Sequence, residues 1–529
     1  MIAAPSPVPR QLTAGPLSCW LVGADLRRIT VGGTEVVQRI YAAVRDGGWA
    51  TLPLRISRQE IAQTATGFHV VTEVEGDHNG IAYQARVVHT GSTDGTVHVS
   101  FAGEARTAFA SQRIGLCILH PLTLAGSGLH VTHDDGSSEH LTLPTAIAPW
   151  QPARRIRALQ TTSGGARVQL EFSGTVFEME DQRNWGDASF KTYCTPQDWP
   201  RPVAVAVGDR VAQGVVLSVL AVPDTDTALP AVTRLQIGER PRPRARLGHL
   251  CDAEHGHVLL PLDPLAQWKE QLAAAEFTRS RNGLPVVVTV SAEAVTPGFA
   301  QGLAAALPPD SELLVLDGAA ASDCTTALEI LRAAIPADVP VGSGSRHQFT
   351  EVNRGVSTAG DLLCFAINPL VHADDDWSLL ENTAAFPAIV ASARAWGRPL
   401  RIGPLALPPG DPRSATERGA AWLVATLARL LPVLEADDAL TLAPASTLAV
   451  TPSGAVLSAL AATSGLLPVD GTHDGIAAFA TVTSSVTGTG KRIFIANTGH
   501  LPAAVLVTGI RQGGEALRLA PWTMAILDG

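Results

Sequence analysis

The sequence predicts a multidomain protein of the α/β plus β class: an N-terminal antiparallel β-sandwich, a central (β/α)8 barrel of the TIM type and a small C-terminal β-domain. Three observations lead to this prediction. Apolar and polar residues alternate with period two up to about residue 240, apolar strands then alternate with helical stretches, and β patterns return near the end. A chain of 529 residues is also too long for one hydrophobic core.

Residues 1–240 have the pattern of successive β-hairpins. The stretch "GFHVVTEVEGDHNGIAYQARVVHTGSTDGTVHVSFAGEAR" contains three alternating runs, separated by the turn signals "EGDHNG" and "GSTDG". Alternation returns in "ARVQLEFSGTVFEME". We expect a large antiparallel sandwich that carries the arm "EMEDQRNWGDASFKTY".

Residues 245–450 follow a basic, proline-containing linker, "GERPRPRARLG". Seven apolar strands alternate here with helical stretches: "HVLLPLD", "LPVVVTVSAEA", "ELLVLDG", "VPVGSGS", "DLLCFAINPLVHA", "LRIGPLAL" and "ALTL". Buried strands joined by helices predict a parallel sheet, and this number over about 200 residues fits a compact barrel with one strand unrecognised. No G-x-G-x-x-G or Walker motif favours a nucleotide-binding fold. Residues 451–529 are expected to form the final barrel helix and the C-terminal β-domain.

Composition and charge limit the partners. A net charge of -10 and a pI near 5.8 argue against nucleic acid or an anionic membrane, and are compatible with a homo-oligomer. The six cysteines are scattered without a C-x-x-C pair, as in a reducing cytoplasm. Prolines interrupt the N-terminal stretch where a signal peptide would be apolar, and other apolar stretches are too short to span a bilayer. We expect a cytoplasmic protein.

The most polar segment is "FEMEDQRNWGDASFKTYCTP", Phe177 to Pro196. Strand alternation places Glu178 and Glu180 on one face, roughly 6–7 Å apart at the backbone, with Phe177 and Met179 on the other. The following "DQRNWGDASFKTY" is expected to leave the sheet as an irregular arm anchored by its two aromatic residues. An exposed loop held by salt bridges is the alternative. The mixture of aromatic, amide and both kinds of charged side chain favours an arm folded onto another surface.

The ends of the barrel strands are the second place where chemistry is expected. In "FAINPLVHADDDW", Asn368 and His372 follow an apolar strand, and a histidine near carboxylates acts as a general base or binds a metal. Residues Asp374 to Asp376 also fit an alternative role as the cap and first turn of a helix. "GSGSRHQFTEVNRG" supplies further polar side chains, as substrate contacts or as a polar loop.

Metal and cofactor signals are weak. "GHLCDAEHGH", Gly248 to His257, is rich in Cys and His, but no second pair follows at the spacing of structural zinc. There is no H-E-x-x-H motif and no G-x-S-x-G elbow. We expect no metal and no cofactor.

At "FEMEDQRNWGDASFKTYCTP" the sequence resembles the D-apionate lactonase family, which opens the lactone of D-apionic acid in the catabolism of the branched pentose apiose. Supporting similarities are "GLCILHP" (Gly115 to Pro121), "FTEVNR" (Phe349 to Arg354) and "INPLVHADD" (Ile367 to Asp375). The resemblance covers most of the chain and implies the same order of β-domain, barrel and β-domain. Leu370 stands where the family motif has glutamine, and Ala443 and Pro444 stand where a glutamate is expected. If that glutamate takes part in the chemistry, this chain is a diverged member with a different substrate or weak activity.

The resemblance implies hydrolysis of a small sugar-acid lactone, D-apionolactone to D-apionate. We expect metal-independent general acid/base attack of water. The catalytic candidates are Glu180, Asp181, His372 and Glu351, with the base and the acid left open. The substrate-binding candidates are Arg183, Asn184, Asp187, Lys191, Tyr193, Asn353, Arg354 and Asn368. Two alternatives remain: a barrel-type glycoside hydrolase, which needs two acids about 5–10 Å apart, and a diverged, non-catalytic sugar-binding member.

Overall fold

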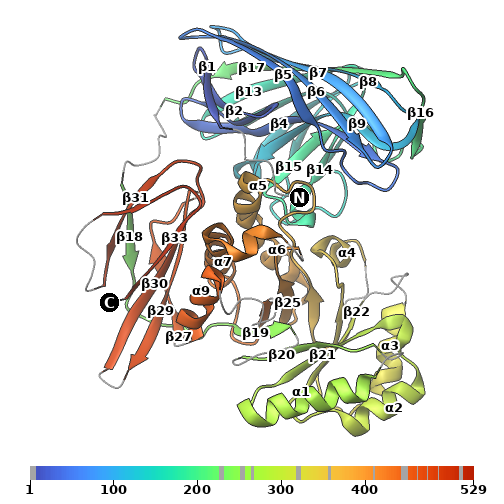
Figure 1. The fold of residues 1–529 in the computed structure, drawn as a ribbon, viewed down its shortest axis with the longest axis vertical. Helices are drawn as coiled ribbons and strands as arrows, with labels where there is room; N and C mark the ends of the chain where they lie inside the picture. Colours follow the sequence, from blue (N-terminus) through green and yellow to red (C-terminus); the bar gives the residue numbers. More distant parts are fainter. Residues whose placement is uncertain are drawn as a thin grey trace. The chain divides into compact units, whose positions relative to one another are not determined.

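The computed structural model describes residues 8–224, 232–250, 256–263, 267–316, 323–355, 359–408, 411–442, 451–461, 463–473, 475–485, 488–510 and 516–528 (Figure 1). It divides into two compact units. The first consists of Met1–Gln182 and Ser189–Leu229, and the second of Arg183–Ala188 and Pro230–Gly529. Ala443, Pro444 and most of the Cys- and His-rich stretch, residues 251–255, lie outside the described residues.

Among its described residues, the first unit is an antiparallel β-structure of 17 hydrogen-bonded strands around a large hydrophobic cluster, which confirms the predicted N-terminal sandwich. Asn79 and Gly80, with φ of 52° and 78°, form the tight turn between β6 and β7 that "EGDHNG" predicts. The strands are β1 (Arg10–Ala14), β2 (Leu17–Val22), β3 (Asp25–Val31), β4 (Thr34–Asp46), β5 (Arg55–Gln63), β6 (Phe68–His78), β7 (Ile81–Gly91), β8 (Val97–Ala105), β9 (Phe109–Pro121), β10 (Gly128–His133), β11 (Ser138–Thr142), β12 (Ala153–Ser163), β13 (Ala166–Ser173), β14 (Phe177–Asp181), β15 (Ser189–Tyr193), β16 (Val203–Val205) and β17 (Arg210–Ala221).

The sheet formed by β4, β9, β15 and β14 has one polar and one apolar face. In β14, Phe177 and Met179 lie in the hydrophobic cluster, whereas Glu178 pairs with Tyr193 and Glu180 pairs with Lys191 across to β15. The predicted alternation is therefore confirmed. The irregular arm is shorter than predicted, because Ser189–Tyr193 returns to the sheet as β15 and Phe190 packs in the core. Only the turn around the short 3-10 helix η2 (Gln182–Trp185) leaves the sheet.

The second unit contains the predicted closed barrel of eight parallel strands. The strand that sequence patterns missed is β19, which lies at the end of the basic linker and closes the barrel against β26. Its strands are β19 (Arg246–Leu250), β20 (Val258–Pro261), β21 (Val286–Ser291), β22 (Glu312–Leu316), β23 (Val341–Gly344), β24 (Leu363–Phe365), β25 (Leu400–Leu405) and β26 (Ala439–Leu442). Its helices are α1 (Trp268–Asn282), α2 (Pro297–Ala306), α3 (Asp323–Arg332), α4 (Phe349–Asn353), α5 (Asp376–Glu381), α6 (Phe386–Ala393) and α7 (Glu417–Leu430), with short 3-10 turns η3 (Ala292–Ala294), η4 (Asn382–Ala385), η5 (Arg394–Trp396) and η6 (Pro412–Ala415).

A buried ion triad links three barrel strands. Arg401 donates through Nε and Nη2 to both oxygens of Glu312, at 2.5 and 2.7 Å, and Arg246 donates to Oε1 at 2.7 Å. Burial alone would raise the pKa of Glu312, but the two arginines hold it below its ordinary value. The carboxylate therefore stays ionised inside the barrel, and the triad fixes β19, β22 and β25 together.

The C-terminal part is a small β-domain, as predicted, made of two four-stranded sheets preceded by α9 (Pro452–Ala461). One sheet has the order β28 (Val469–Asp470), β18 (Thr233–Ile237), β31 (Ala503–Thr508) and β32 (Leu517–Leu519), and the other β27 (Thr463–Leu467), β29 (Ile476–Ser485), β30 (Gly488–Asn497) and β33 (Met524–Asp528). The sequence pattern places residues 233–237 in the N-terminal domain, whereas β18 pairs in parallel with β31. This pairing is non-local, so alternation within the strand could not reveal it. Among the described residues, no helix has the length and apolar character needed to cross a bilayer.

Candidate active site

Polar side chains gather where β23 and β24 end in the barrel unit. Helix α4 follows β23, and the segment that carries His372 follows β24. Residues Arg183–Ala188, which connect β14 to β15 in the sequence, belong to this same unit. The carboxyl ends of barrel strands are where enzymes of this fold assemble their reactive groups.

The central contact is between His372 and Asp187. The imidazole Nδ1 lies 2.6 Å from Asp187 Oδ2, and the two side chains are 17% and 9% exposed. Because a carboxylate oxygen accepts, Nδ1 carries a hydrogen, and in the neutral imidazole the lone pair is then on Nε2. The Trp185 ring meets the imidazole edge-on, with centroids 5.8 Å apart. The histidine is thus fixed in one tautomer and one orientation.

Asn382, at the start of η4, holds the carboxylate in turn. Its Nδ2 donates to Asp187 Oδ1 at 3.3 Å and to the Pro369 carbonyl at 2.7 Å, while its Oδ1 accepts from the Ala188 N–H at 3.1 Å. Both polar atoms of the Asn382 amide therefore help to position the dyad of Asp187 and His372. Sequence patterns gave no signal for Asn382, because it lies inside a stretch that reads as an ordinary helix.

The rest of the arm makes two further contacts with the residues after β23. Asn353 Nδ2 donates to Asn184 Oδ1 at 2.8 Å, and the Arg354 guanidinium lies 5.4 Å from the Trp185 ring centroid. Gly186 has φ of +91°, and a Cβ there would lie 2.8 Å from the Asn368 carbonyl oxygen. A glycine is required at this point because the backbone is both left-handed and in close contact.

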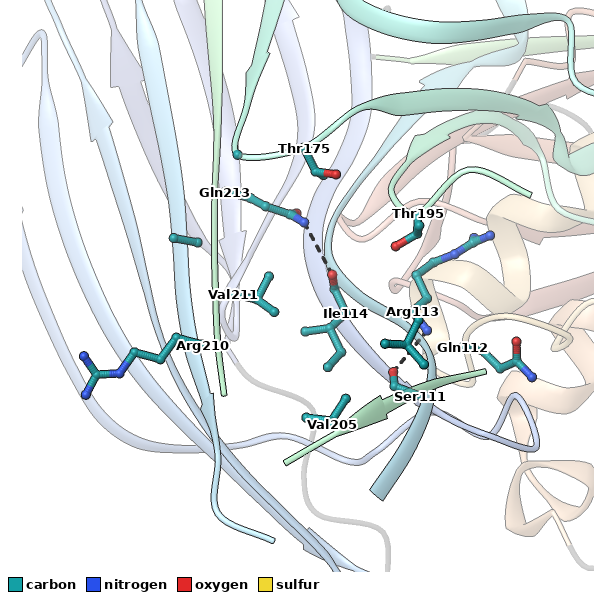
Figure 2. A pocket seen from close by; sticks show the side chains of 13 residues that line it. Ser111, Gln112, Arg113, Ile114, Thr175, Thr195, Val205, Arg210, Val211 and Gln213 are labelled. Carbon is teal, nitrogen blue, oxygen red and sulfur yellow. Dashed lines mark hydrogen bonds between the residues drawn. The ribbon is translucent and has the colours of Figure 1, made fainter. Parts of the chain in front are cut away.

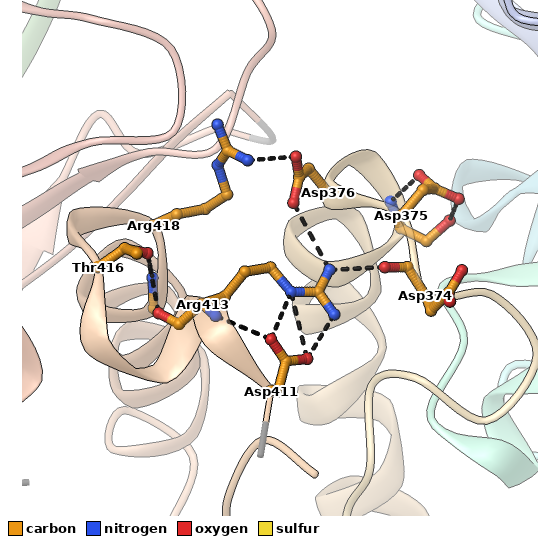
Figure 3. A network of polar contacts seen from close by, with 9 residues as sticks. Asp374, Asp375, Asp376, Asp411, Arg413, Thr416 and Arg418 are labelled. Atoms are coloured by element: carbon orange, nitrogen blue, oxygen red, sulfur yellow. Dashed lines mark hydrogen bonds and ion pairs between the residues drawn. The ribbon is translucent and has the colours of Figure 1, made fainter. Parts of the chain in front are cut away.

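A network of ion pairs fixes the chain directly after His372 (Figure 3). Arg413 Nη1 donates to the Asp374 carbonyl at 2.6 Å, and the same guanidinium binds both oxygens of Asp411. Asp376 pairs with Arg418 and lies 3.5 Å from Arg413, and Asp375 caps α5 by accepting from the Ser378 N–H at 3.0 Å. The aspartates thus take the structural role that the sequence offered as an alternative.

The first unit holds a second polar group, on the polar face of β14 and β15. Glu178 Oε1 accepts from Tyr193 Oη at 2.7 Å and from the Gln197 N–H at 2.6 Å, and burial raises the pKa of Glu178. Glu180 Oε2 accepts from Gln182 Nε2 at 3.2 Å. The Lys191 side chain is buried, and this burial lowers its pKa. A cavity of about 310 Å³ in the same unit is lined mainly by residues of β9, β16 and β17, among them Ser111 and Val211 (Figure 2).

The candidates therefore separate into two groups. One lies in the barrel unit and contains Arg183, Asn184, Asp187, Glu351, Asn353, Arg354 and His372; the other lies in the first unit and contains Glu180, Lys191 and Tyr193. Two candidates have structural contacts instead. Asp181 lies on the core side of β14 and accepts from the Ala148 N–H at 3.0 Å, and Asn368 Oδ1 accepts from the Leu370 N–H at 2.9 Å in a local turn. We carry neither into the mechanism. Among the described residues, no group of three or more His, Cys, Asp or Glu side chains is placed to hold a metal ion.

Two family models match the chain: "D-apionate lactonase, N-terminal domain" over residues 1–222 and "D-apionate lactonase, TIM barrel domain" over residues 236–410. A curated D-apionate lactonase of Brucella anthropi is 30% identical over 447 residues, which cover 76% of this chain and 73% of that protein. Among solved structures, a galactose 1-epimerase of Lactobacillus acidophilus matches 39% of this chain and 92% of its own, with 6% identity and a TM-score of 0.26. A GH30 endoxylanase of Clostridium papyrosolvens matches 56% of this chain and 99% of its own, with 9% identity and a TM-score of 0.31.

Proposed function

This chain belongs to the D-apionate lactonase family and is a lactone-hydrolysing enzyme, and from this premise we propose that it opens D-apionolactone to D-apionate in the catabolism of a branched pentose. The reaction adds water to a cyclic ester. It needs a base that activates the water, donors that stabilise the negative charge on the carbonyl oxygen, and an acid that protonates the departing ring oxygen.

The pairing of Asp187 with His372 is the observation that carries the proposed mechanism. With its Nδ1–H donated to Asp187 at 2.6 Å, the imidazole presents Nε2 as the base. Nε2 takes a proton from water while the water oxygen bonds to the lactone carbonyl carbon. The resulting imidazolium is stabilised by the Asp187 carboxylate. A positioned base of this kind accelerates a reaction by about 10²–10⁴-fold.

The tetrahedral intermediate then collapses. The bond from the carbonyl carbon to the ring oxygen breaks, and the ring oxygen receives a proton from the His372 imidazolium or from Glu351, which lies on α4 beside Asn353. Arg183, Arg354 and Asn353 are the proposed donors to the oxyanion, and one such donor contributes about 3–4 kcal/mol of barrier lowering. Glu180, Lys191 and Tyr193 belong to the first unit, and we assign them no role in this scheme. No step of this scheme requires a metal ion.

The test is lactone opening by the purified protein, followed by acid release with a pH indicator and corrected for spontaneous hydrolysis. D-Apionolactone is compared with unbranched aldonolactones, each with and without EDTA. We expect opening of the branched lactone at the same rate with EDTA, and loss of at least 100-fold in kcat for His372→Asn. His78→Asn, at an exposed position, is the matched control.

Three results would count against the proposal. Rates no faster than spontaneous hydrolysis would reject lactone opening. Loss of activity in EDTA that added metal restores would reject the metal-independent scheme. A His372→Asn variant with wild-type kcat would reject the assignment of the base.

A further inference from the structure

Three buried cations lie on the polar face of β4, β9 and β15 in the first unit. Arg45 pairs directly opposite Arg113, and Lys191 lies on the neighbouring strand; their exposed fractions are 7%, 4% and 1%. Like charges directly opposite one another on neighbouring strands destabilise a sheet. Burying them adds a desolvation cost. Such an arrangement requires compensation by an anion.

Among the described residues, hydrogen-bond partners satisfy the buried guanidinium of Arg113 only in part. Arg45 Nη1 donates to the Trp49 carbonyl at 3.0 Å. The Arg113 guanidinium stacks on the Tyr193 ring at 3.6 Å, but its Nε and Nη2 are buried and have no hydrogen-bond partner among the described residues. Two carboxylates lie on this face: Glu178 is already hydrogen-bonded to Tyr193 and to the Gln197 N–H, and Glu180 lies opposite Lys191 and accepts from Gln182. Arg113 Nε–H and Nη2–H, the two donors on one edge of the guanidinium, thus have no acceptor among the described residues.

That edge has a specific shape. Nε–H and Nη2–H of an arginine point the same way and match the two oxygens of a carboxylate. Elsewhere in this protein the same edge holds carboxylates: Arg401 binds both oxygens of Glu312 in this way, and Arg279 binds Glu276 at 2.6 and 2.9 Å. At Arg113 the same edge has no hydrogen-bonded carboxylate among the residues that the structure describes.

The surroundings of Arg113 suit a small polar acid. Trp49, which is 41% exposed, has its ring within 5.4 Å of both Arg113 and Arg201, so an aromatic face reaches from solvent to the cationic group. The Arg113 guanidinium leaves β9 on the side of Thr195 and away from Val211 (Figure 2). A second cation, Lys191, lies 5.7 Å from the Tyr193 ring that Arg113 covers.

We propose that the N-terminal domain binds the carboxylate of a small hydroxy acid on the Nε–Nη2 edge of Arg113, with Lys191 and Arg201 adding positive charge. The proposal rests on the proposed function in one respect: lactone opening turns a neutral ester into such an acid, so D-apionate is the ligand expected. The binding itself depends only on the geometry of the first unit.

The test is isothermal titration calorimetry of the whole protein with D-apionate, D-apionolactone and inorganic phosphate. We expect wild type to bind the acid and not the neutral lactone at this site, and Arg113→Met to bind the acid 10- to 100-fold more weakly. Arg113→Lys, which keeps the charge but loses the two-pronged edge, should fall between them. Arg58→Met is the matched control, because Arg58 is an exposed arginine paired with Glu60.

Thermal unfolding supplies a second readout that a purely structural arginine would not change. The acid should raise the Tm of wild type and of Arg58→Met but not that of Arg113→Met. Equal affinity of Arg113→Met and wild type for the acid, or no binding by wild type, would overturn the proposal. Binding of phosphate without the acid would overturn the assignment to a carboxylate. If wild type opens no lactone yet binds the acid through Arg113, the proposed function fails and this inference stands.

Discussion

Replacement of Asp187 by asparagine tests the proposed dyad most directly, because the change keeps the shape and inverts one hydrogen bond. Asn382 Nδ2 donates to Asp187 Oδ1 at 3.3 Å, so the new amide must keep its oxygen at that position. Its nitrogen then takes the place of Oδ2, 2.6 Å from His372 Nδ1, and donates to it. The imidazole proton is driven to Nε2, and the base is lost.

The expected effect is a fall in kcat of about 10²–10⁴-fold, which corresponds to about 2.7–5.4 kcal/mol at 1.36 kcal/mol per factor of ten. The fold should tolerate the change, because volume and the contact with Asn382 are kept. We expect a cost of about 1–2 kcal/mol in the free energy of unfolding, from weakening one hydrogen bond to a charged group. Loss of activity would then not reflect unfolding.

The assay is the initial rate of lactone opening from pH 5 to 9 in a pH-stat, with Asp77→Asn at an exposed position as control. The rate of Asp187→Asn should rise with hydroxide concentration across the range, because hydroxide replaces the water that the base would activate. Wild-type kcat within threefold, or a change in KM alone, would refute the tautomer argument.

Three further predictions concern neighbouring features. Gly186→Ala should lower kcat at least tenfold, because the new Cβ would lie 2.8 Å from a backbone oxygen. Gly397 is the control: it has φ of +64° but no atom within 4 Å of a new Cβ, so Gly397→Ala should affect stability only. Arg413→Met should lower kcat severalfold, because the chain after His372 loses its anchor. Arg413→Lys should restore only part of the lost kcat. Unchanged kcat in both variants would show that the network has a structural role alone. Burial lowers the pKa of His89 to about 4, so the unfolded state takes up a proton near pH 6.5 that the folded state does not bind. Through His89 alone, acidification from pH 8 to 5 should cost about 2 kcal/mol of stability. His89→Phe should reduce the fall in Tm over that range, and an identical fall would contradict the sign of the pKa shift.

Local patterns were sufficient for most of the fold because most elements bury one or both faces in a regular way. Strands such as β21 (VVVTVS) are mainly apolar and almost entirely buried, and β14 alternates, so period and length identified them. Two strands escaped for different reasons. β19 has the sequence "RLGHL", without an apolar run. β18 precedes the barrel in the sequence, whereas its partner β31 follows it. Neither property is visible in a window of the length of one strand.

The site was predictable in composition but not in pairing. The segment around Asp187 and the segment around His372 were each recognised by their mixture of polar groups at a strand end. Their 2.6 Å contact joins residues 185 positions apart, which no spacing rule reaches. Asn382 carried no signal at all, because an asparagine inside a helical stretch usually faces solvent. The proposed role of Asp187 accordingly changes from binding substrate to orienting the base.

The partners of residues 184–188 explain why so polar a segment is buried. Asn184 bonds to Asn353, Asp187 to His372 and Asn382, and the Ala188 N–H to Asn382. Each bond recovers part of the desolvation cost, yet a buried polar cluster of this kind seldom exceeds an apolar one in stability. An apolar turn between β14 and β15 would therefore serve the fold at least as well. Keeping Asp187 against His372 in this turn therefore costs stability. The proposed role of this pair in lactone hydrolysis accounts for that cost, whereas packing does not.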